Sequence, residues 1–267
     1  MSAGTSLVRW SHDGWRGWLD LRAGVSPGAC LAAAATDGGG RRSRHAWTRP
    51  FDGPTGRLWL KTYAAPDGVR ARRAWRMGAV LRTSGFAAPE GVLVGTRAGA
   101  GVLVTRDTGG RPLVDAVAAS ADRRAKRRLL DVVGAAVARL HAAGFVHGDL
   151  VPTNVHVRDG ELVFLDHDRT RRGALLAWWG ARRNLVQLGR FVVPGVGATD
   201  RARVLRAYAA GRGLSRRARH RLARWTIAKT VQRRCAIDAI PPELAARVGF
   251  PTLMRSGGPF DPGGGGS

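Results

Sequence analysis

Spacing of apolar residues divides the chain into a strand-rich first part and a helical second part. Residues 57–63 form a short apolar run with one polar interruption between Gly56 and Pro66, which is typical of a strand. Residues 69–83 carry apolar positions at helical spacing among arginines, so they predict a helix. Residues 91–105 hold two runs of valine and leucine around a glycine-rich turn and predict a hairpin.

The pattern changes beyond this hairpin. Residues 120–143 predict a long amphipathic helix with leucine and valine on one face, and Gly144 ends it. Two short strands are expected at 154–157 and 162–165, joined by an Arg-Asp-Gly turn. The region from residue 173 to about residue 248 is mostly helical in its spacing.

These elements predict an α+β chain in three parts. Residues 1–108 would be a lobe of antiparallel strands with one helix, and residues 109–256 a mainly helical lobe. Residues 257–267 are rich in Gly and Pro and are expected to be disordered. Within the first lobe, the residues up to about 45 show no clear period and are expected to be irregular.

Charge is the strongest feature of the composition. The 267 residues hold 44 Lys and Arg against 19 Asp and Glu, a formal net charge of +25 that favours anionic partners such as a phosphorylated substrate, an anionic membrane or nucleic acid. Much of this excess also fits a solvated surface in a chain rich in Ala, Gly and Arg. Cys30 and Cys235 are expected to be free thiols, and without an apolar leader near Met1 the chain is expected to be cytoplasmic.

Three polar residues follow the long helix in an order that suits phosphoryl transfer. Asp149 lies on the loop after the helix, where it can orient or deprotonate a substrate hydroxyl. Asn154 begins the first short strand and Asp166 ends the second, and a hairpin brings these two positions to one edge. Their side-chain oxygens are ligands of the kind that Mg²⁺ prefers.

This order of residues resembles the catalytic loop and the later metal-binding Asp of protein-kinase-like phosphotransferases. The chain also contains the segments Leu165-Asp166-His167-Asp168-Arg169 and Arg183-Asn184-Leu185-Val186-Gln187-Leu188-Gly189-Arg190. Within that superfamily, both resemble segments of the lipopolysaccharide core kinases, the heptose and Kdo kinases. The resemblance covers roughly residues 55–195. The resemblance implies a two-lobed protein-kinase-like fold with a strand-rich N-lobe and a mainly helical C-lobe.

The resemblance also implies a role for each site residue. Asp149 would be the catalytic base, Asn154 and Asp166 the Mg²⁺ ligands, and Lys61 the contact to the phosphates of ATP. Asp168 is open between a metal or shape-holding role and a solvent-facing charge. Gly148 replaces the arginine that regulated protein kinases use to pair with an activation-loop phosphate.

Two parts of the expected nucleotide site are unclear in the sequence. Kinases pair the strand lysine with a glutamate on the following helix, but residues 69–83 contain no Asp or Glu, and Ala74 is near the expected position. Gly38-Gly39-Gly40 is either a remnant of the glycine-rich nucleotide loop or a plain surface loop.

The sequence thus favours an ATP- and Mg²⁺-dependent kinase that phosphorylates a sugar hydroxyl of a lipopolysaccharide core or a similar anionic glycolipid. Its arginine pairs leave open a peripheral contact with the inner face of an anionic inner membrane. One alternative is an aminoglycoside- or choline-type kinase, which shares the His-Gly-Asp loop. Another is a pseudokinase without turnover, suggested by the missing helix carboxylate. Nucleic acid is not expected as a partner, because the chain has no recognisable reading motif.

Overall fold

The computed structural model describes residues 6–36 and 39–262. The chain forms two compact units, one of Met1–Gly109 with Phe164–Thr170 and one of Gly110–Val163 with Arg171–Ser267. The segment Phe164–Thr170, which carries Asp166, therefore packs within the first unit, although it lies in the range predicted for the second lobe. Each unit has its own elements.

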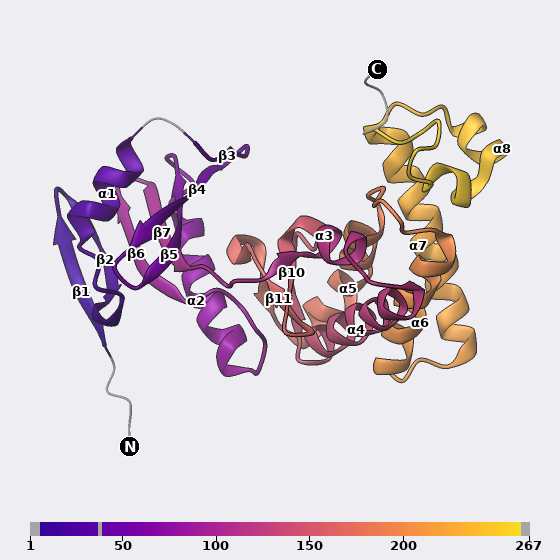
Figure 1. Ribbon diagram of the computed structural model, residues 1–267, viewed down its shortest axis with the longest axis horizontal. Coiled ribbons are helices and arrows are strands. Elements are labelled where there is room, and N and C mark those ends of the chain that lie inside the picture. Colours follow the sequence, from indigo (N-terminus) through magenta and orange to yellow (C-terminus); the bar gives the residue numbers. More distant parts are fainter. Residues whose placement is uncertain (1–5, 37–38, 263–267) are drawn as a thin grey trace. The chain divides into compact units, whose positions relative to one another are not determined.

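A seven-stranded antiparallel sheet in the order β1-β2-β6-β7-β5-β4-β3 is the centre of the first unit (Figure 1). Its elements are β1 (Leu7–His12), β2 (Trp15–Asp20), the 3₁₀ turn η1 (Leu21–Ala23), α1 (Pro27–Ala35), β3 (Arg41–Arg42), β4 (Ala46–Gly53), β5 (Gly56–Tyr63), α2 (Val69–Thr83), β6 (Gly91–Arg97) and β7 (Ala100–Arg106). The strand, helix and hairpin predicted between residues 57 and 105 are confirmed as β5, α2 and β6–β7.

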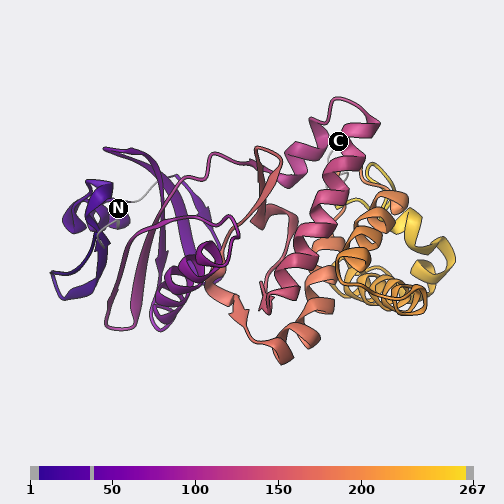
Figure 2. The same cartoon turned by 90° about the horizontal axis from the view of Figure 1, so that it is seen from below.

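Side chains alternate between the two faces of this sheet, as the period of a strand requires. On one face, Leu58 and Leu60 of β5 share a core with Cys30 of α1. On the other, Tyr63 of β5 shares a core with Ala71 and Ala74 of α2. Figure 2 shows this helix lying against the strands of the sheet. The odd-numbered positions of β5 therefore face α2.

The expectation of irregular structure before residue 45 is wrong. Leu7–His12 and Trp15–Asp20 pair as a hairpin around Asp13-Gly14, and a helix follows that begins after Ser26. Both signals are present in the sequence, because Asp-Gly favours a two-residue hairpin turn and Ser before Pro favours a helix start. The oxygen of Ser26 accepts a hydrogen bond from the Ala29 amide at 3.1 Å.

The second unit is mainly helical. Its elements are β8 (Arg111–Pro112), α3 (Leu113–Ala118), α4 (Arg123–Ala142), β9 (Phe145–Val146), the 3₁₀ turn η2 (Pro152–Asn154), β10 (Val155–Arg158), β11 (Glu161–Phe164, whose last residue belongs to the first unit), β12 (Arg171–Arg172), α5 (Ala174–Gly189), α6 (Ala198–Gly211), α7 (Arg216–Ile237) and α8 (Pro242–Leu253). The strands form two small sheets, in the orders β11-β10-β8 and β12-β9.

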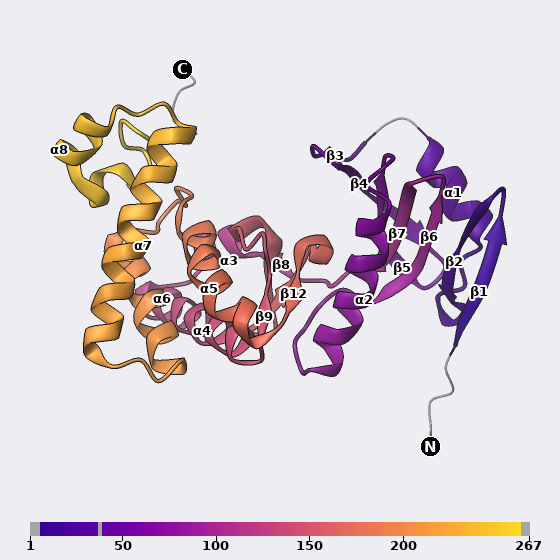
Figure 3. The same ribbon diagram turned by 180° about the vertical axis from the view of Figure 1, so that it is seen from behind.

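Helices α4 and α6 lie side by side in this unit (Figure 3). Their close approach depends on Gly134 of α4, because a Cβ there would lie 2.3 Å from the carbonyl oxygen of Val204. The predicted amphipathic helix is confirmed as α4, which buries Leu130, Val133 and Val137 along one face. This stripe fixes the position of the helix end from which the His-Gly-Asp loop starts.

The end of the chain continues as turns for a few residues beyond α8. The carbonyl oxygen of Phe260 accepts a hydrogen bond from the Arg234 guanidinium, and the ring of Phe260 packs beside Ile240 and Leu253. Residues 257–262 of the predicted disordered tail therefore have packing partners, and residues 263–267 lie outside the described residues. None of the described helices combines the length and apolar character needed to cross a bilayer.

Candidate active site

Lys61 lies on β5 with its side chain on the face of the sheet that α2 covers. Its Nζ donates a hydrogen bond of 2.6 Å to Oδ1 of Asp166. The ammonium also lies 5.2 Å from the ring centre of Tyr63, two positions along the same strand. Lys61 is thus held between a carboxylate and an aromatic face, without a glutamate from the helix.

Asp166 follows β11 in the left-handed backbone region, with φ 59° and ψ 70°. Asp is one of the few non-glycine residues that tolerate this conformation, which recurs where a side chain is held in a functional position. The backbone before it is fixed, because the Phe164 amide donates to the Ala87 carbonyl at 3.0 Å and the Phe164 ring meets Phe86 edge-on at 6.5 Å. These contacts set the place at which Asp166 meets Lys61.

Asp168 is buried on the same segment, next to the first turns of α2. Its Oδ2 lies 3.6 Å from a guanidinium nitrogen of Arg70, and its backbone oxygen lies 3.5 Å from one of Arg73. Arg70 is held in turn by Asp67, whose Oδ1 accepts from Nε at 2.8 Å. Burial raises the pKa of the Asp168 carboxyl, and the nearby negative charge of Asp166 raises it further.

Helix α2 contacts the segment of Asp168 through a positive charge, whereas a kinase is expected to present a glutamate from this helix. Helix α2 carries no Asp or Glu, and the small side chain of Ala74 is buried near the position expected for that glutamate. The helix contributes the cation of Arg70, and the segment after β11 contributes the carboxylate of Asp168. Of the two readings left open for Asp168, the structure excludes the solvent-facing charge, because this residue is only 7% exposed.

The loop His147-Gly148-Asp149 belongs to the second unit and is held by α5. The amide of His147 donates to Oδ1 of Asn184 at 3.0 Å. Gln187 binds on both sides of Asp149, since its Nε2 donates to the Gly148 carbonyl at 2.8 Å and its Oε1 accepts from the Leu150 amide at 3.2 Å. Gly148 has φ 78°, a conformation that glycine adopts without strain.

Asn184 is fully buried and is itself fixed by a histidine. Its Oδ1 already accepts from the His147 amide, so His141 must donate to the same oxygen from Nε2, at 3.1 Å. Burial lowers the pKa of His141 to about 4, which keeps the ring neutral. Nδ1 then accepts from the Tyr208 hydroxyl at 3.1 Å. This chain of hydrogen bonds determines the orientation of the amide that holds the loop.

Asn154 is the last residue of the short turn η2, which follows this loop, and its side chain contacts the loop backbone. Its Nδ2 donates to the backbone oxygen of Asp149 at 3.0 Å, so its Oδ1 is left as the acceptor end of the amide. Arg190, at the end of α5, lies close enough to Asp149 for their charges to interact. Burial lowers the pKa of Arg190, and the negative charge of Asp149 opposes that shift.

The structure thus brings the four predicted residues together as two pairs, Lys61 with Asp166 in the first unit and Asp149 with Asn154 in the second. Within the described residues no cluster of three or more His, Cys, Asp or Glu side chains offers a metal site. Of the three glycines considered for the nucleotide loop, Gly38 lies outside the described residues, and Gly40 precedes β3.

Three partners of the site were not identified from the sequence. Arg70 was counted among the arginines of the helix, and Asn184 and Gln187 were noticed only as part of a family segment. Their spacing of three residues on one helix face was the available signal for a shared contact. Which backbone groups they bind depends on the fold.

The strand-rich sheet, the loop of Asp149 and the helical unit are those of a protein-kinase-like phosphotransferase. The chain belongs to the lipopolysaccharide kinase (Kdo/WaaP) family, whose model matches residues 55–208. This match confirms the resemblance drawn from the sequence and includes all four predicted site residues.

Solved structures support the same fold. The crystal structure of an aminoglycoside-3'-phosphotransferase of type VIII is similar with a TM-score of 0.55 and 18% identity, over 76% of this chain and 98% of that one. An aminoglycoside phosphotransferase, APH(3'')-Id, from Streptomyces rimosus in complex with ADP and streptomycin has a TM-score of 0.51 and 17% identity, over 73% and 93%.

One curated relative matches a shorter stretch. It is a probable bifunctional tRNA threonylcarbamoyladenosine biosynthesis protein of Methanothermobacter thermautotrophicus, 35% identical over 97 residues. The match covers 36% of this chain and only 16% of that protein's length.

Proposed function

We propose that this protein transfers the γ-phosphate of ATP to a hydroxyl of a sugar in a lipopolysaccharide core or a similar anionic glycolipid. The observation that carries the proposal is the loop of Asp149, which Gln187 holds on both sides in a member of the Kdo/WaaP family. The net charge of +25 supports an anionic acceptor, and it supports peripheral contact of a cytoplasmic protein with an anionic inner membrane.

In this proposal each site residue has one role. Asp149 takes the proton from the acceptor hydroxyl, whose oxygen then bonds to the γ-phosphorus as the bond to ADP breaks. Lys61 holds the phosphates of ATP, and the carboxylate of Asp166 keeps the ammonium in place until the nucleotide binds. The fixed loop lowers the barrier by positioning Asp149, because an oriented base needs no reorganisation.

Mg²⁺ is the metal of this proposal, because the carboxylate of Asp166 and the amide oxygen of Asn154 are hard oxygen donors. Asn154 uses its donor end, Nδ2, for the hydrogen bond to the Asp149 carbonyl. When bound, Mg²⁺ supplies positive charge against the phosphate oxygens. Asp166 and Asn154 are proposed to hold it.

An acceptor panel with ATP and Mg²⁺ tests the proposal. We expect transfer to core oligosaccharides, and a fall in kcat of about a hundredfold or more for Asp149→Asn. Asp159→Asn is the matched control, because Asp159 is exposed in the β10–β11 turn and its left-handed φ of 52° suits Asn. Full activity of Asp149→Asn would disprove the assigned base.

The likeness to aminoglycoside phosphotransferases favours a second candidate, a kinase of aminoglycosides or choline-like small molecules. If the same panel shows transfer to aminoglycosides and not to core oligosaccharides, the acceptor is an aminoglycoside-like small molecule and the proposal of a core sugar is wrong.

The pseudokinase alternative rests on the missing carboxylate of α2. The contact of 2.6 Å between Lys61 and Asp166 weakens that reason, because the lysine has a carboxylate partner from another element. Mg²⁺-dependent binding of ATP without turnover of any acceptor, and without ATP hydrolysis, would favour the pseudokinase.

A further inference from the structure

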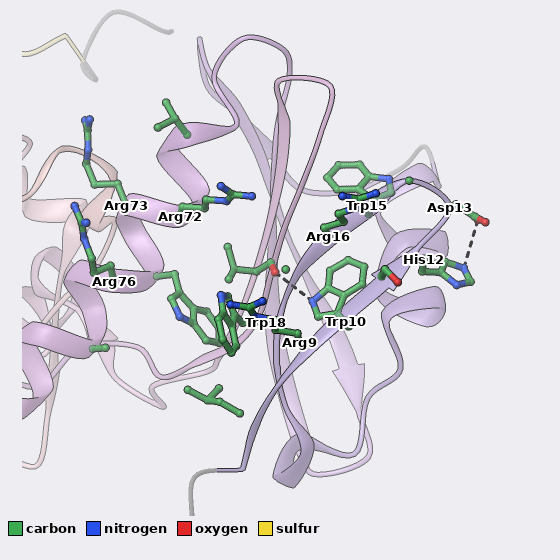
Figure 4. A pocket seen from close by; sticks show the side chains of 18 of the residues that line it. Arg9, Trp10, His12, Asp13, Trp15, Arg16, Trp18, Arg72, Arg73 and Arg76 are labelled. Carbon is green, nitrogen blue, oxygen red and sulfur yellow. Dashed lines mark hydrogen bonds and ion pairs between the residues drawn. The ribbon is translucent and has the colours of Figure 1, made fainter.

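A basic groove lies in the first unit between the β1–β2 hairpin and α2 (Figure 4). Two arginines of the hairpin and three of α2 line it: Arg9, Arg16, Arg72, Arg73 and Arg76. Asp13 is the one acidic residue of its lining, and it pairs with His12 at the hairpin turn. These arginines are separate from the paired arginines that the sequence suggested as membrane contacts.

The positive charge of the groove follows from the composition of α2. The helix has five arginines and no acidic residue, so no carboxylate of its own neutralises the side chains on either face. Arg70 points to the segment of Asp168, whereas Arg72 and Arg76 are exposed at the groove. Guanidinium groups bind phosphate with two parallel donors, so a cluster of them favours phosphate-bearing ligands.

Apolar side chains stand exposed beside the same arginines. Leu7 is 39% exposed, Trp18 41% and Val69 61%, and all three line the groove. The guanidinium of Arg9 stacks over the Trp18 ring at 5.2 Å, which joins a cation and an indole at one point of the surface. Exposed apolar side chains among arginines are typical of surfaces that dock at the headgroup level of a bilayer.

The other tryptophans of the groove argue against a single-stranded nucleic acid. Binding of successive bases needs several free aromatic faces. Trp10 donates its indole N–H to the Val94 carbonyl at 3.2 Å, Trp15 packs against the core beside α1, and Trp75 packs against the core beneath α2. Trp18 alone of the four is exposed, which is too few for a stacking platform.

We propose that this groove docks the protein on an anionic lipid bilayer, with lipid phosphates bound by its arginines and with Leu7, Trp18 and Val69 at the headgroup level. The proposal names the surface for the peripheral membrane contact proposed above and rests on that part of the proposed function. It does not depend on which acceptor is phosphorylated.

Sedimentation with vesicles of phosphatidylcholine, with and without phosphatidylglycerol, tests the proposal. We expect the protein to bind only the vesicles that contain phosphatidylglycerol, and added salt to weaken the binding. The double variant Arg16→Glu/Arg76→Glu should bind about tenfold more weakly or worse. Both side chains are exposed and have no hydrogen bond or ion pair among the described residues, so circular dichroism should show an unchanged fold.

Arg216→Glu/Arg217→Glu is the matched control, with the same change of charge on exposed arginines at the start of α7. It should retain most of the binding. Equal losses in both double variants would mean that general charge, and not the groove, binds the vesicles, and would overturn the proposal. So would an absence of vesicle binding, or binding of single-stranded RNA in place of vesicles through the groove arginines.

Phosphate transfer to a water-soluble acceptor, measured in the same preparations, separates this proposal from the proposed function. We expect the groove variant to keep that transfer, because Arg16 and Arg76 lie outside the catalytic residues. Vesicle binding that depends on the groove in a protein without any transfer would leave the docking surface standing and contradict the kinase activity.

Discussion

Lys61 and Asp166 lie 105 residues apart in the sequence and share a hydrogen bond of 2.6 Å. The lysine side chain is 16% exposed and the aspartate 32%, so the pair is partly buried and still reached by solvent. A single ion pair that solvent still reaches adds about 1 kcal/mol or less to folding stability. Its position beside the left-handed backbone of Asp166 therefore indicates a functional use.

Replacement of this lysine tests that use. Lys61→Met should lower kcat by about a hundredfold, because a preorganised cation is lost from the phosphates, while the free energy of unfolding changes by less than about 1 kcal/mol. Steady-state kinetics and urea unfolding measure the two effects. Lys229→Met, an exposed change on α7, is the control and should alter neither. A large loss of stability in Lys61→Met would mean that the pair is structural.

The contact of Arg70 with Asp168 gives a second prediction. Arg70→Met and Asp168→Asn should be coupled by about 1 kcal/mol in a double-mutant cycle of unfolding free energies, because each removes the partner of the other. Arg76 lies on the same helix without a contact to Asp168. A cycle of Arg76→Met with Asp168→Asn should therefore show a coupling near zero, and equal coupling in both cycles would contradict the assigned pair.

Asn184 should be the most sensitive residue of the loop support. Asn184→Ala leaves the His147 amide and Nε2 of His141 without an acceptor in a buried site, so the free energy of unfolding should fall by about 2–4 kcal/mol. Activity should fall with it as the loop of Asp149 loses its support. The control is Arg183→Ala, an exposed neighbour on α5 that should stay within about 0.5 kcal/mol of the parent protein.

The buried His141 predicts a dependence of stability on pH. Its pKa is lowered from 6.5 to about 4 in the folded protein, so below pH 6.5 the unfolded chain binds the proton more readily. This group therefore lowers stability as the pH falls from 6.5 towards 4, by about 2 kcal/mol between pH 7.5 and pH 5. Urea unfolding at the two pH values measures the change.

The variant His141→Asn isolates this contribution. Asn does not titrate. The free energy of unfolding of the variant should be lower than that of the parent protein at pH 7.5, but it should therefore fall less between pH 7.5 and pH 5. An equal fall in both proteins would show that other groups cause the pH dependence.

Much of the fold could be predicted from local patterns. Helix α2 was expected at residues 69–83 and is found there, because its apolar stripe and the glycine after it depend on nearby residues alone. The hairpin β1–β2 carried an equally local Asp-Gly signal that was not recognised. The pairing of β1–β2 with β6 could not be predicted, since strands distant in sequence pair through the global fold.

The sequence by itself determined the family and singled out the four polar residues that we propose for the site, because the loop of Asp149 and the segment of Asp166 are short motifs with fixed spacing. Only the tertiary structure decided what holds them. The carboxylate that contacts Lys61, the cation that meets Asp168 and the two amides that fix the Asp149 loop come from elements far apart in the chain. Packing of those elements sets such contacts, and no local pattern records it.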